Sequence, residues 1–276
     1  MKHDVAADLE LAIHAAREAG KVVMRSFRTE QAVTLKSPDQ PLTQADLAAD
    51  AMLKRILLGN RVDYGWLSEE TVDSPERLER KHVWIVDPID GTRSYIAGYP
   101  EFAISIGLAE NERAIAGVVY NPATGEMYAA RQGGGAWRVG GDALNVQRSG
   151  SGRVLVASRS EIRKGELEPF ESSFEIAGTG STAYKMMKVA DGSAHAFVSR
   201  GPKSEWDVCA GVLIVEEAGG RATDLKGREI RYNQKRTEIY GILATNGALH
   251  SEMLDRVAEL PESERLSGWK SDEVER

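Results

Sequence analysis

The feature that most constrains the fold is a short apolar run that ends in an acidic turn, VWIVDPIDGT at residues 83–92. Residues 83–86 have the pattern of a buried strand, and Pro88 and Gly91 interrupt it. Pro88 fixes its own φ and favours an extended Asp87, so Asp87 and Asp90 come together after one tight turn. The sequence therefore predicts two carboxylates at the carboxyl end of a buried strand.

Two carboxylates this close repel each other unless a cation neutralises them. Gly91 and Thr92 follow directly and are expected to offer backbone N–H groups at a helix start, where an anion is favoured. Mg²⁺ binds carboxylates together with substrate phosphate oxygens. A magnesium site beside a bound phosphate is one interpretation, and the alternative is that Asp90 merely caps the following helix.

The string WIVDPIDGT resembles the metal-binding signature of the inositol monophosphatase superfamily, which includes fructose-1,6-bisphosphatases and bisphosphate nucleotidases. Three further segments match in the family's order: TQAD at 43–46, LSEE at 67–70 and EWDVCAG at 205–211. The resemblance covers about residues 5–260. It implies an alternating α-β-α-β-α sandwich, an α/β fold with α+β layering, that is commonly a homodimer.

The composition is that of an ordinary globular protein: 276 residues, 42% hydrophobic, with a formal net charge of −7. That charge disfavours nucleic-acid polymers as partners, so a phosphate site must supply its own positive charge. A single cysteine, Cys209, fits a reducing compartment. With no signal-peptide pattern and no run of about 18 apolar residues, we expect a cytoplasmic protein that does not enter a membrane.

The order of predicted elements suggests two halves and a tail. Residues 1–150 read as an α+β half that carries the metal motifs, beginning with an amphipathic helix over residues 4–27. Residues 71–82 read as a charged surface segment with an exposed His82, and the glycines at 133–135 as a turn rather than a phosphate cradle. Strand and helix alternate over 151–262, which predicts a second α/β half that completes the site. The tail 263–276 is polar, a composition typical of disorder.

Each acidic segment also has an ordinary structural explanation. Thr43 with Asp46, and Ser204 with Asp207, fit capping boxes at helix starts. Glu69 and Glu70 are also typical of a solvated loop. What favours a shared site is that four acidic segments, each at the end of a predicted element, occur in the order of one family.

The resemblance implies a role for each of these residues. Glu69, Asp87 and the carbonyl of Ile89 would hold one Mg²⁺, and Asp87, Asp90 and Asp207 a second, with a third ion near Glu70 as an option. Two ions about 3.5–4 Å apart suit in-line displacement at phosphorus. Thr92 and Asp46 would activate the attacking water, which makes Asp46, Thr92 and Glu69 the expected catalytic residues.

Several departures from the inositol enzymes favour a nucleotide substrate. The turn continues with Arg93, and SRS at 158–160 resembles a nucleotidase segment. Arg200 stands seven positions before Asp207, where inositol enzymes carry an acid, and a guanidinium suits a second phosphate. The expected substrate contacts are Gly91, Thr92, Arg93, Ser181, Lys185, Arg200 and Lys203.

The resulting hypothesis is a Mg²⁺-dependent 3′(2′),5′-bisphosphate nucleotidase that converts 3′-phosphoadenosine 5′-phosphate into AMP and phosphate. An inositol-1-monophosphatase or a broad sugar-phosphate phosphatase is the alternative enzyme. A metal-binding interaction protein without catalysis is the alternative from another class, and it predicts the loss of at least one metal ligand. The chain keeps Glu69, Asp87, Asp90, Thr92 and Asp207.

Overall fold

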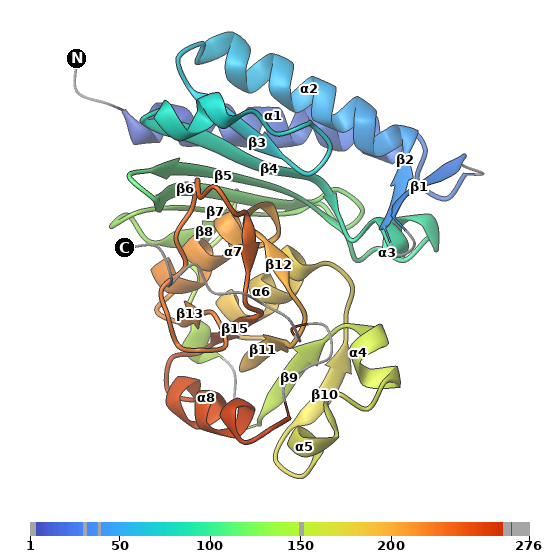
Figure 1. Ribbon diagram of the computed structural model, residues 1–276, viewed down its shortest axis with the longest axis vertical. Coiled ribbons are helices and arrows are strands. Elements are labelled where there is room, and N and C mark those ends of the chain that lie inside the picture. Colours follow the sequence, from blue (N-terminus) through green and yellow to red (C-terminus); the bar gives the residue numbers. More distant parts are fainter. Residues whose placement is uncertain (1–3, 30–31, 38–39, 149–151, 262–265, 267–276) are drawn as a thin grey trace.

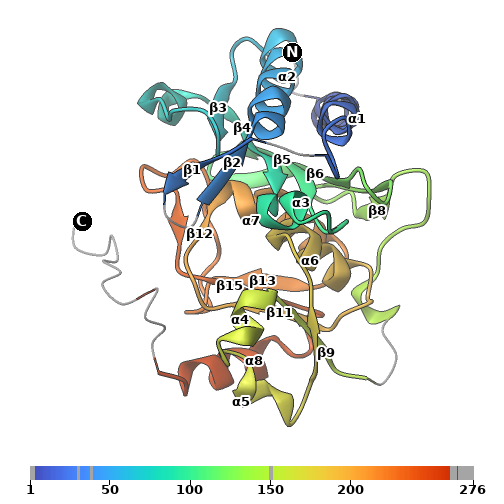
Figure 2. The same cartoon turned by 90° about the vertical axis from the view of Figure 1, so that its right-hand side faces the viewer.

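Helices and sheets alternate in five layers in the computed structural model, which describes residues 4–29, 32–37, 40–148, 152–261 and 266 (Figures 1 and 2). This arrangement confirms the layered α/β fold expected from the sequence. The expected domain boundary at residue 150 and most of the expected tail, residues 263–265 and 267–276, lie outside the described residues. No helix among the described residues is long and apolar enough to cross a membrane.

The first layer consists of helices α1 (Val5–Met24) and α2 (Gln44–Asn60). The apolar stripe of α1, which includes Leu9, Ile13 and Val23, is buried against the sheet beneath it. Asp4 caps α1 by accepting hydrogen bonds from two backbone N–H groups of its first turn. In the chain, an antiparallel hairpin connects the two helices: β1 (Val33–Ser37) and β2 (Gln40–Thr43).

The second layer is a six-stranded sheet in the order β3-β4-β5-β6-β7-β8. Its strands are β3 (Gly65–Ser68), β4 (His82–Asp90), β5 (Ala103–Glu110), β6 (Arg113–Asn121), β7 (Glu126–Arg131) and β8 (Ala136–Arg138). Only the β3–β4 pair is parallel.

Strand β4 is buried along its whole length and continues to Asp90, beyond the end at Val86 that the sequence predicted. Its pairing with β5 shifts register between Asp87 and Asp90, around Pro88, which has no N–H to donate. The chain stays extended there while the ladder is interrupted, which turns the two acids toward the layer below. The short helix α3 (Thr92–Ile96) follows at once.

The third layer, helices α6 (Thr182–Ala190) and α7 (Glu205–Glu217), lies between the two large sheets (Figure 1). Buried residues occur on every face of α7, as expected for a helix enclosed on both sides. Cys209 belongs to this buried set. Helix α7 thereby joins the two halves of the chain in one core.

The fourth layer is a five-stranded sheet in the order β10-β9-β11-β15-β13. Its strands are β9 (Val154–Ala157), β10 (Glu175–Gly178), β11 (Ala196–Ser199), β13 (Arg221–Thr223) and β15 (Ile242–Thr245). The parallel group β10-β9-β11 corresponds to the predicted strand–helix alternation, whereas β15 and β13 pair antiparallel. Helices α4 (Arg159–Arg163), α5 (Glu168–Glu171) and α8 (His250–Ala258) form the outer layer, and β12 (Lys203–Ser204) pairs with β14 (Glu238–Ile239).

Two side chains of the segment predicted to be exposed are instead buried. His82 lies against the ring of Tyr64 and hydrogen-bonds to Glu110. Arg77, in the 3₁₀ turn Pro75–Glu79, is 2% exposed and donates to the side chain of Asn233 and the carbonyl of Gln234. The sequence prediction missed both because a highly charged segment is usually exposed to solvent. A polar side chain can be buried, however, when other residues satisfy its hydrogen bonds.

The triple glycine forms a turn, as predicted, and it does bind an anion. The N–H groups of Gly133 and Gly135 each donate to the carboxylate of Glu217, at 2.7 Å. A side chain of the protein itself therefore occupies the position that a phosphate cradle would leave for substrate.

Candidate active site

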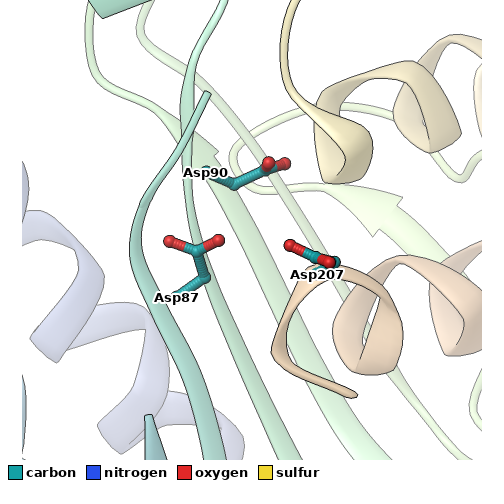
Figure 3. A group of neighbouring side chains, drawn as sticks. All are labelled: Asp87, Asp90 and Asp207. Atoms are coloured by element: carbon teal, nitrogen blue, oxygen red, sulfur yellow. The ribbon is translucent and has the colours of Figure 1, made fainter. Parts of the chain in front are cut away.

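Three aspartates from two layers converge between β4 and α7 (Figure 3). Asp87 and Asp90 come from the end of β4, and Asp207 from the first turn of α7. One carboxylate oxygen of each lies within 4.8 Å of the others. Residues that are far apart in the chain therefore form one acidic cluster, as the sequence motifs indicated.

Hydrogen bonds fix the orientation of each carboxylate. Asp87 Oδ1 accepts from the N–H of Ile89 at 3.0 Å. Asp90 Oδ2 accepts from the Ser181 hydroxyl at 2.5 Å and from the N–H of Ala183 at 2.6 Å. Asp207 Oδ2 accepts from the N–H of Ser204 at 2.7 Å, so the capping interaction anticipated for Asp207 is present as well.

The raised pKa values in the acidic cluster indicate that a cation would stabilise its charged form. Burial, together with repulsion from Glu69 and Asp90, raises the pKa of Asp87 well above its ordinary value. Burial also raises the pKa of Asp207 to about 7, against the attraction of Lys203. Aligned carboxylates that are hard to ionise alone are the donor set that a divalent cation stabilises. The described residues therefore fit a metal ion.

Glu69 lines the same pocket as the aspartates, and Lys36 lies over it. The Lys36 ammonium, from β1, donates to Glu69 at 2.6 Å and to Glu70 at 2.8 Å. Burial opposes its charge, but the two glutamates more than offset this and raise its pKa. No sequence pattern indicates this contact, because no fixed spacing links a lysine of this hairpin to the acidic motifs.

Asp46 carries out two interactions at once. Its Oδ2 accepts from the backbone N–H and hydroxyl of Thr43, at 2.8 and 2.6 Å, which completes the capping box of α2. Its Oδ1 lies 3.3 Å from the Thr92 hydroxyl, which also lies 3.1 Å from the carbonyl of Ile89. Burial raises the pKa of Asp46, so this carboxylate is a stronger base than a surface aspartate.

Gly91 allows the turn after β4 to approach helix α6 closely. Its φ of +95° is unfavourable for other residues, and an added Cβ would lie 3.1 Å from the N–H nitrogen of Ser181. The turn and the α6 N-cap are therefore packed backbone to backbone. Gly91 and Thr92, the expected phosphate anchors, both line the pocket.

The pocket has a volume of about 420 Å³, and it is acidic at the aspartates and basic elsewhere. The cations among its lining residues are Arg93, Arg159, Arg163, Lys185 and Lys203. Lys185 is 3% exposed, and its ammonium lies 5.0 Å from the centroid of the Phe197 ring. Burial lowers the pKa of Lys185 to about 8, although Glu161 opposes this.

Glu161 is a pocket residue that the sequence prediction missed. Burial works against its charge, but Lys203 and Lys185 outweigh burial and lower its pKa to about 2. Ser158 and Ser199 each donate a hydroxyl to it at 2.5 Å. The only sequence signal is the capping-box spacing from Ser158, which indicates a helix start and not a pocket.

Arg200 lies outside this pocket, which corrects the expectation that it contacts a substrate phosphate. Its guanidinium donates to the carbonyl of Pro261, and it lines a separate pocket with residues of α8. Successive side chains of an extended strand point to opposite faces. Because Ser199 at the end of β11 points to Glu161, Arg200 is directed away from the site.

A layered α/β fold with an acidic cluster beside a tight turn and several cations defines a metal-dependent phosphatase. The sequence model described as "Inositol monophosphatase family" matches residues 4–262. The chain therefore belongs to the inositol monophosphatase family, a family of metal-dependent hydrolases of phosphate monoesters.

Similarity to individual proteins extends over most of the chain. An inositol-1-monophosphatase of Rhizobium meliloti (strain 1021) is 36% identical over 231 residues, 79% of this chain and 86% of the relative. The solved IMPase of Thermotoga maritima has a TM-score of 0.81 at 28% identity, covering 91% of this chain and 96% of that one. CysQ of Bacteroides thetaiotaomicron has a TM-score of 0.74 at 27% identity, covering 87% and 97%.

Proposed function

We propose that this protein is a Mg²⁺-dependent 3′(2′),5′-bisphosphate nucleotidase, which removes the 3′ phosphate from a substrate such as 3′-phosphoadenosine 5′-phosphate and leaves the 5′-monophosphate. The family assignment supports hydrolysis of a phosphate monoester. The nucleotide substrate depends on the basic side of the pocket. The similarity of this chain to the CysQ structure is compatible with a nucleotide substrate.

The observation that carries the proposal is Lys185. Lys185 is 3% exposed and lines the pocket, its ammonium lies 5.0 Å from the centroid of the Phe197 ring, and Glu161 is the carboxylate that most favours its charged form. Lys203 also lines the pocket. Two ammonium groups on one side of the pocket favour an anionic group of the substrate over a sugar hydroxyl as their acceptor. A second phosphate would meet this requirement.

The protein's own groups divide the chemistry among them. Asp87, Asp90, Asp207, Glu69 and the carbonyl of Ile89 would hold the metal. When bound, Mg²⁺ would supply charge stabilisation at the phosphate and acidify a water molecule. The N–H groups of Gly91 and Thr92 would position the phosphate that is cleaved.

Thr92 and Asp46 would manage the proton of the attacking water. The Thr92 hydroxyl would accept the proton from water and pass its own to Asp46 Oδ1, the oxygen not used in the helix cap. The burial that makes Asp46 more basic favours this transfer.

Replacement of Lys185 tests the substrate. We expect Lys185→Met to lower kcat/KM about tenfold or more for adenosine 3′,5′-bisphosphate and to change it little for inositol 1-phosphate. Lys188→Met is the matched control, because Lys188 lies on the same helix, packs on Tyr184 and is not part of the pocket wall. Equal losses on both substrates would contradict a contact with a second phosphate.

Inositol 1-phosphate is the second candidate substrate. The inositol-1-monophosphatases of Rhizobium meliloti and other bacteria favour it by similarity. If wild-type protein hydrolyses inositol 1-phosphate with the higher kcat/KM, the metal site stands and the nucleotide proposal is wrong.

A further inference from the structure

Arg159, at the start of α4, is held between an acid and an aromatic ring at the rim of the pocket. Its Nη1 lies 2.5 Å from Glu101 Oε2, and its Nη2 donates to Glu101 Oε1 at 2.6 Å. Its guanidinium carbon lies over the ring of Tyr99, 4.8 Å from the centroid. Arg159 and Tyr99 both line the same pocket as the aspartates. The two-point pairing and the ring contact fix the guanidinium plane in space.

This arrangement is connected to the metal site through the backbone. Glu101 Oε2 also accepts from the N–H of Gly180 at 2.8 Å. Gly180 precedes Ser181, whose hydroxyl binds Asp90. The arginine and the ring are therefore positioned relative to the acidic cluster by a short chain of contacts.

Arg159 is poorly suited to bind a phosphate. Glu101 neutralises its charge and uses one donor on each terminal nitrogen. Lys185 and Lys203 line the same pocket and are the candidate phosphate ligands. What Arg159 and Tyr99 offer instead is flat, polarisable surface, and both groups are still partly exposed, Tyr99 by 50%. Arginine planes and aromatic rings are the groups on which nucleobases stack.

We propose that Arg159 and Tyr99 form a base-stacking subsite, which holds the planar base of the substrate while its phosphate lies at Asp87, Asp90 and Asp207. This inference rests on the proposed nucleotidase function and assigns the part of the substrate that the metal site does not contact. An inositol or other sugar ring has no π face with which to stack on this surface. A pocket of about 420 Å³ is of the size that holds small-molecule ligands.

The test compares one sugar bisphosphate with and without its base. Phosphate release is measured for adenosine 3′,5′-bisphosphate and for ribose 3,5-bisphosphate, with Mg²⁺, in wild type, Tyr99→Ala, Tyr99→Phe and Arg159→Gln. We expect Tyr99→Ala and Arg159→Gln to lower kcat/KM for the nucleotide about tenfold, mainly through KM, and to leave the base-free substrate within about twofold. Tyr99→Phe keeps the ring and should retain the wild-type preference.

A matched control exists outside the pocket. Arg153 lies over the Phe174 ring at 4.4 Å and pairs with Glu252, the same combination of groups away from the aspartates. Arg153→Gln should leave both substrates unchanged.

The outcomes separate this inference from the proposed function. If the wild type prefers the nucleotide and Tyr99→Ala keeps that preference, the stacking subsite is refuted and the nucleotidase stands. Equal losses on both substrates in the Arg159 variant would show a purely structural role and would also refute it. If the wild type hydrolyses neither bisphosphate, the proposed function fails and the subsite fails with it.

Discussion

Replacing Asp207 with asparagine should stabilise the metal-free protein while it weakens metal binding. In the metal-free state the Asp207 carboxylate lies within 4.8 Å of both Asp87 and Asp90. At an effective dielectric constant near 20, one such pair repels by about 3.5 kcal/mol, and Lys203 offsets part of the total. Asparagine keeps the oxygen that accepts from Ser204 N–H, so the helix cap survives.

Thermal unfolding with chelator and with Mg²⁺ measures both effects. Because about 1 kcal/mol moves the Tm of a chain of this size by about 2–4 °C, we expect Asp207→Asn to raise the Tm by several degrees in chelator. Added Mg²⁺ should then stabilise the variant far less than the wild type, since stabilisation by a ligand follows its affinity.

Asp46→Asn is the matched control for this experiment. Asp46 occupies the same position in a capping box, but it is not part of the acidic cluster. This variant should keep the wild-type response to Mg²⁺ and lose turnover. A lower Tm for Asp207→Asn in chelator, or an undiminished Mg²⁺ response, would refute the argument that repulsion among these carboxylates creates the metal site.

Three further predictions follow from individual contacts. Between pH 8 and 6.5 the metal-free protein should become more stable as pH falls, because the folded state holds protons on Asp207 and Glu205, whose pKa values are both raised to about 7 mainly by burial. Unfolding curves in chelator would show about 1.4 kcal/mol per pH unit per proton, with a smaller slope in Mg²⁺, and a stability that rises with pH would contradict this. Ser181→Ala removes the hydroxyl that donates to Asp90. Titration of activity with Mg²⁺ should then show a Mg²⁺ affinity about 10–100-fold weaker than that of the wild type. An unchanged titration would exclude an orienting role for Ser181. Gly91→Ala should abolish phosphate release because its Cβ would press on the Ser181 backbone. Gly125→Ala is the control, because Gly125 has a similar φ with open space around it, and this variant should lose stability alone. An active Gly91→Ala protein would show that the turn tolerates displacement.

Patterns carried by single segments predicted most of the fold. The apolar stripe of α1, the buried run of β4 and the strand–helix alternation after Val154 each depend on local periodicity, and each is present. The acidic cluster was also predictable, because Asp87, Asp90 and Asp207 occur in motifs that one family keeps in order.

Contacts that depend on the path of the chain between motifs were not predictable. Arg200 stands close to Asp207 in sequence, but the last residue of β11 sets which face it occupies, and a one-residue change would reverse that face. Glu217, which fills the glycine turn, comes from a helix more than eighty positions away. Spacing says nothing about either contact, because tertiary packing decides both.

The rate of phosphate release from adenosine 3′,5′-bisphosphate, with and without Mg²⁺, in wild type and Asp90→Asn, tests the central claim most directly. The account predicts Mg²⁺-dependent release by the wild type and none above background by Asp90→Asn, which should still fold because asparagine can accept the same hydrogen bonds from Ser181 and Ala183. An Asp90→Asn protein with wild-type turnover at saturating Mg²⁺ would contradict the claim that this acidic cluster holds the catalytic metal.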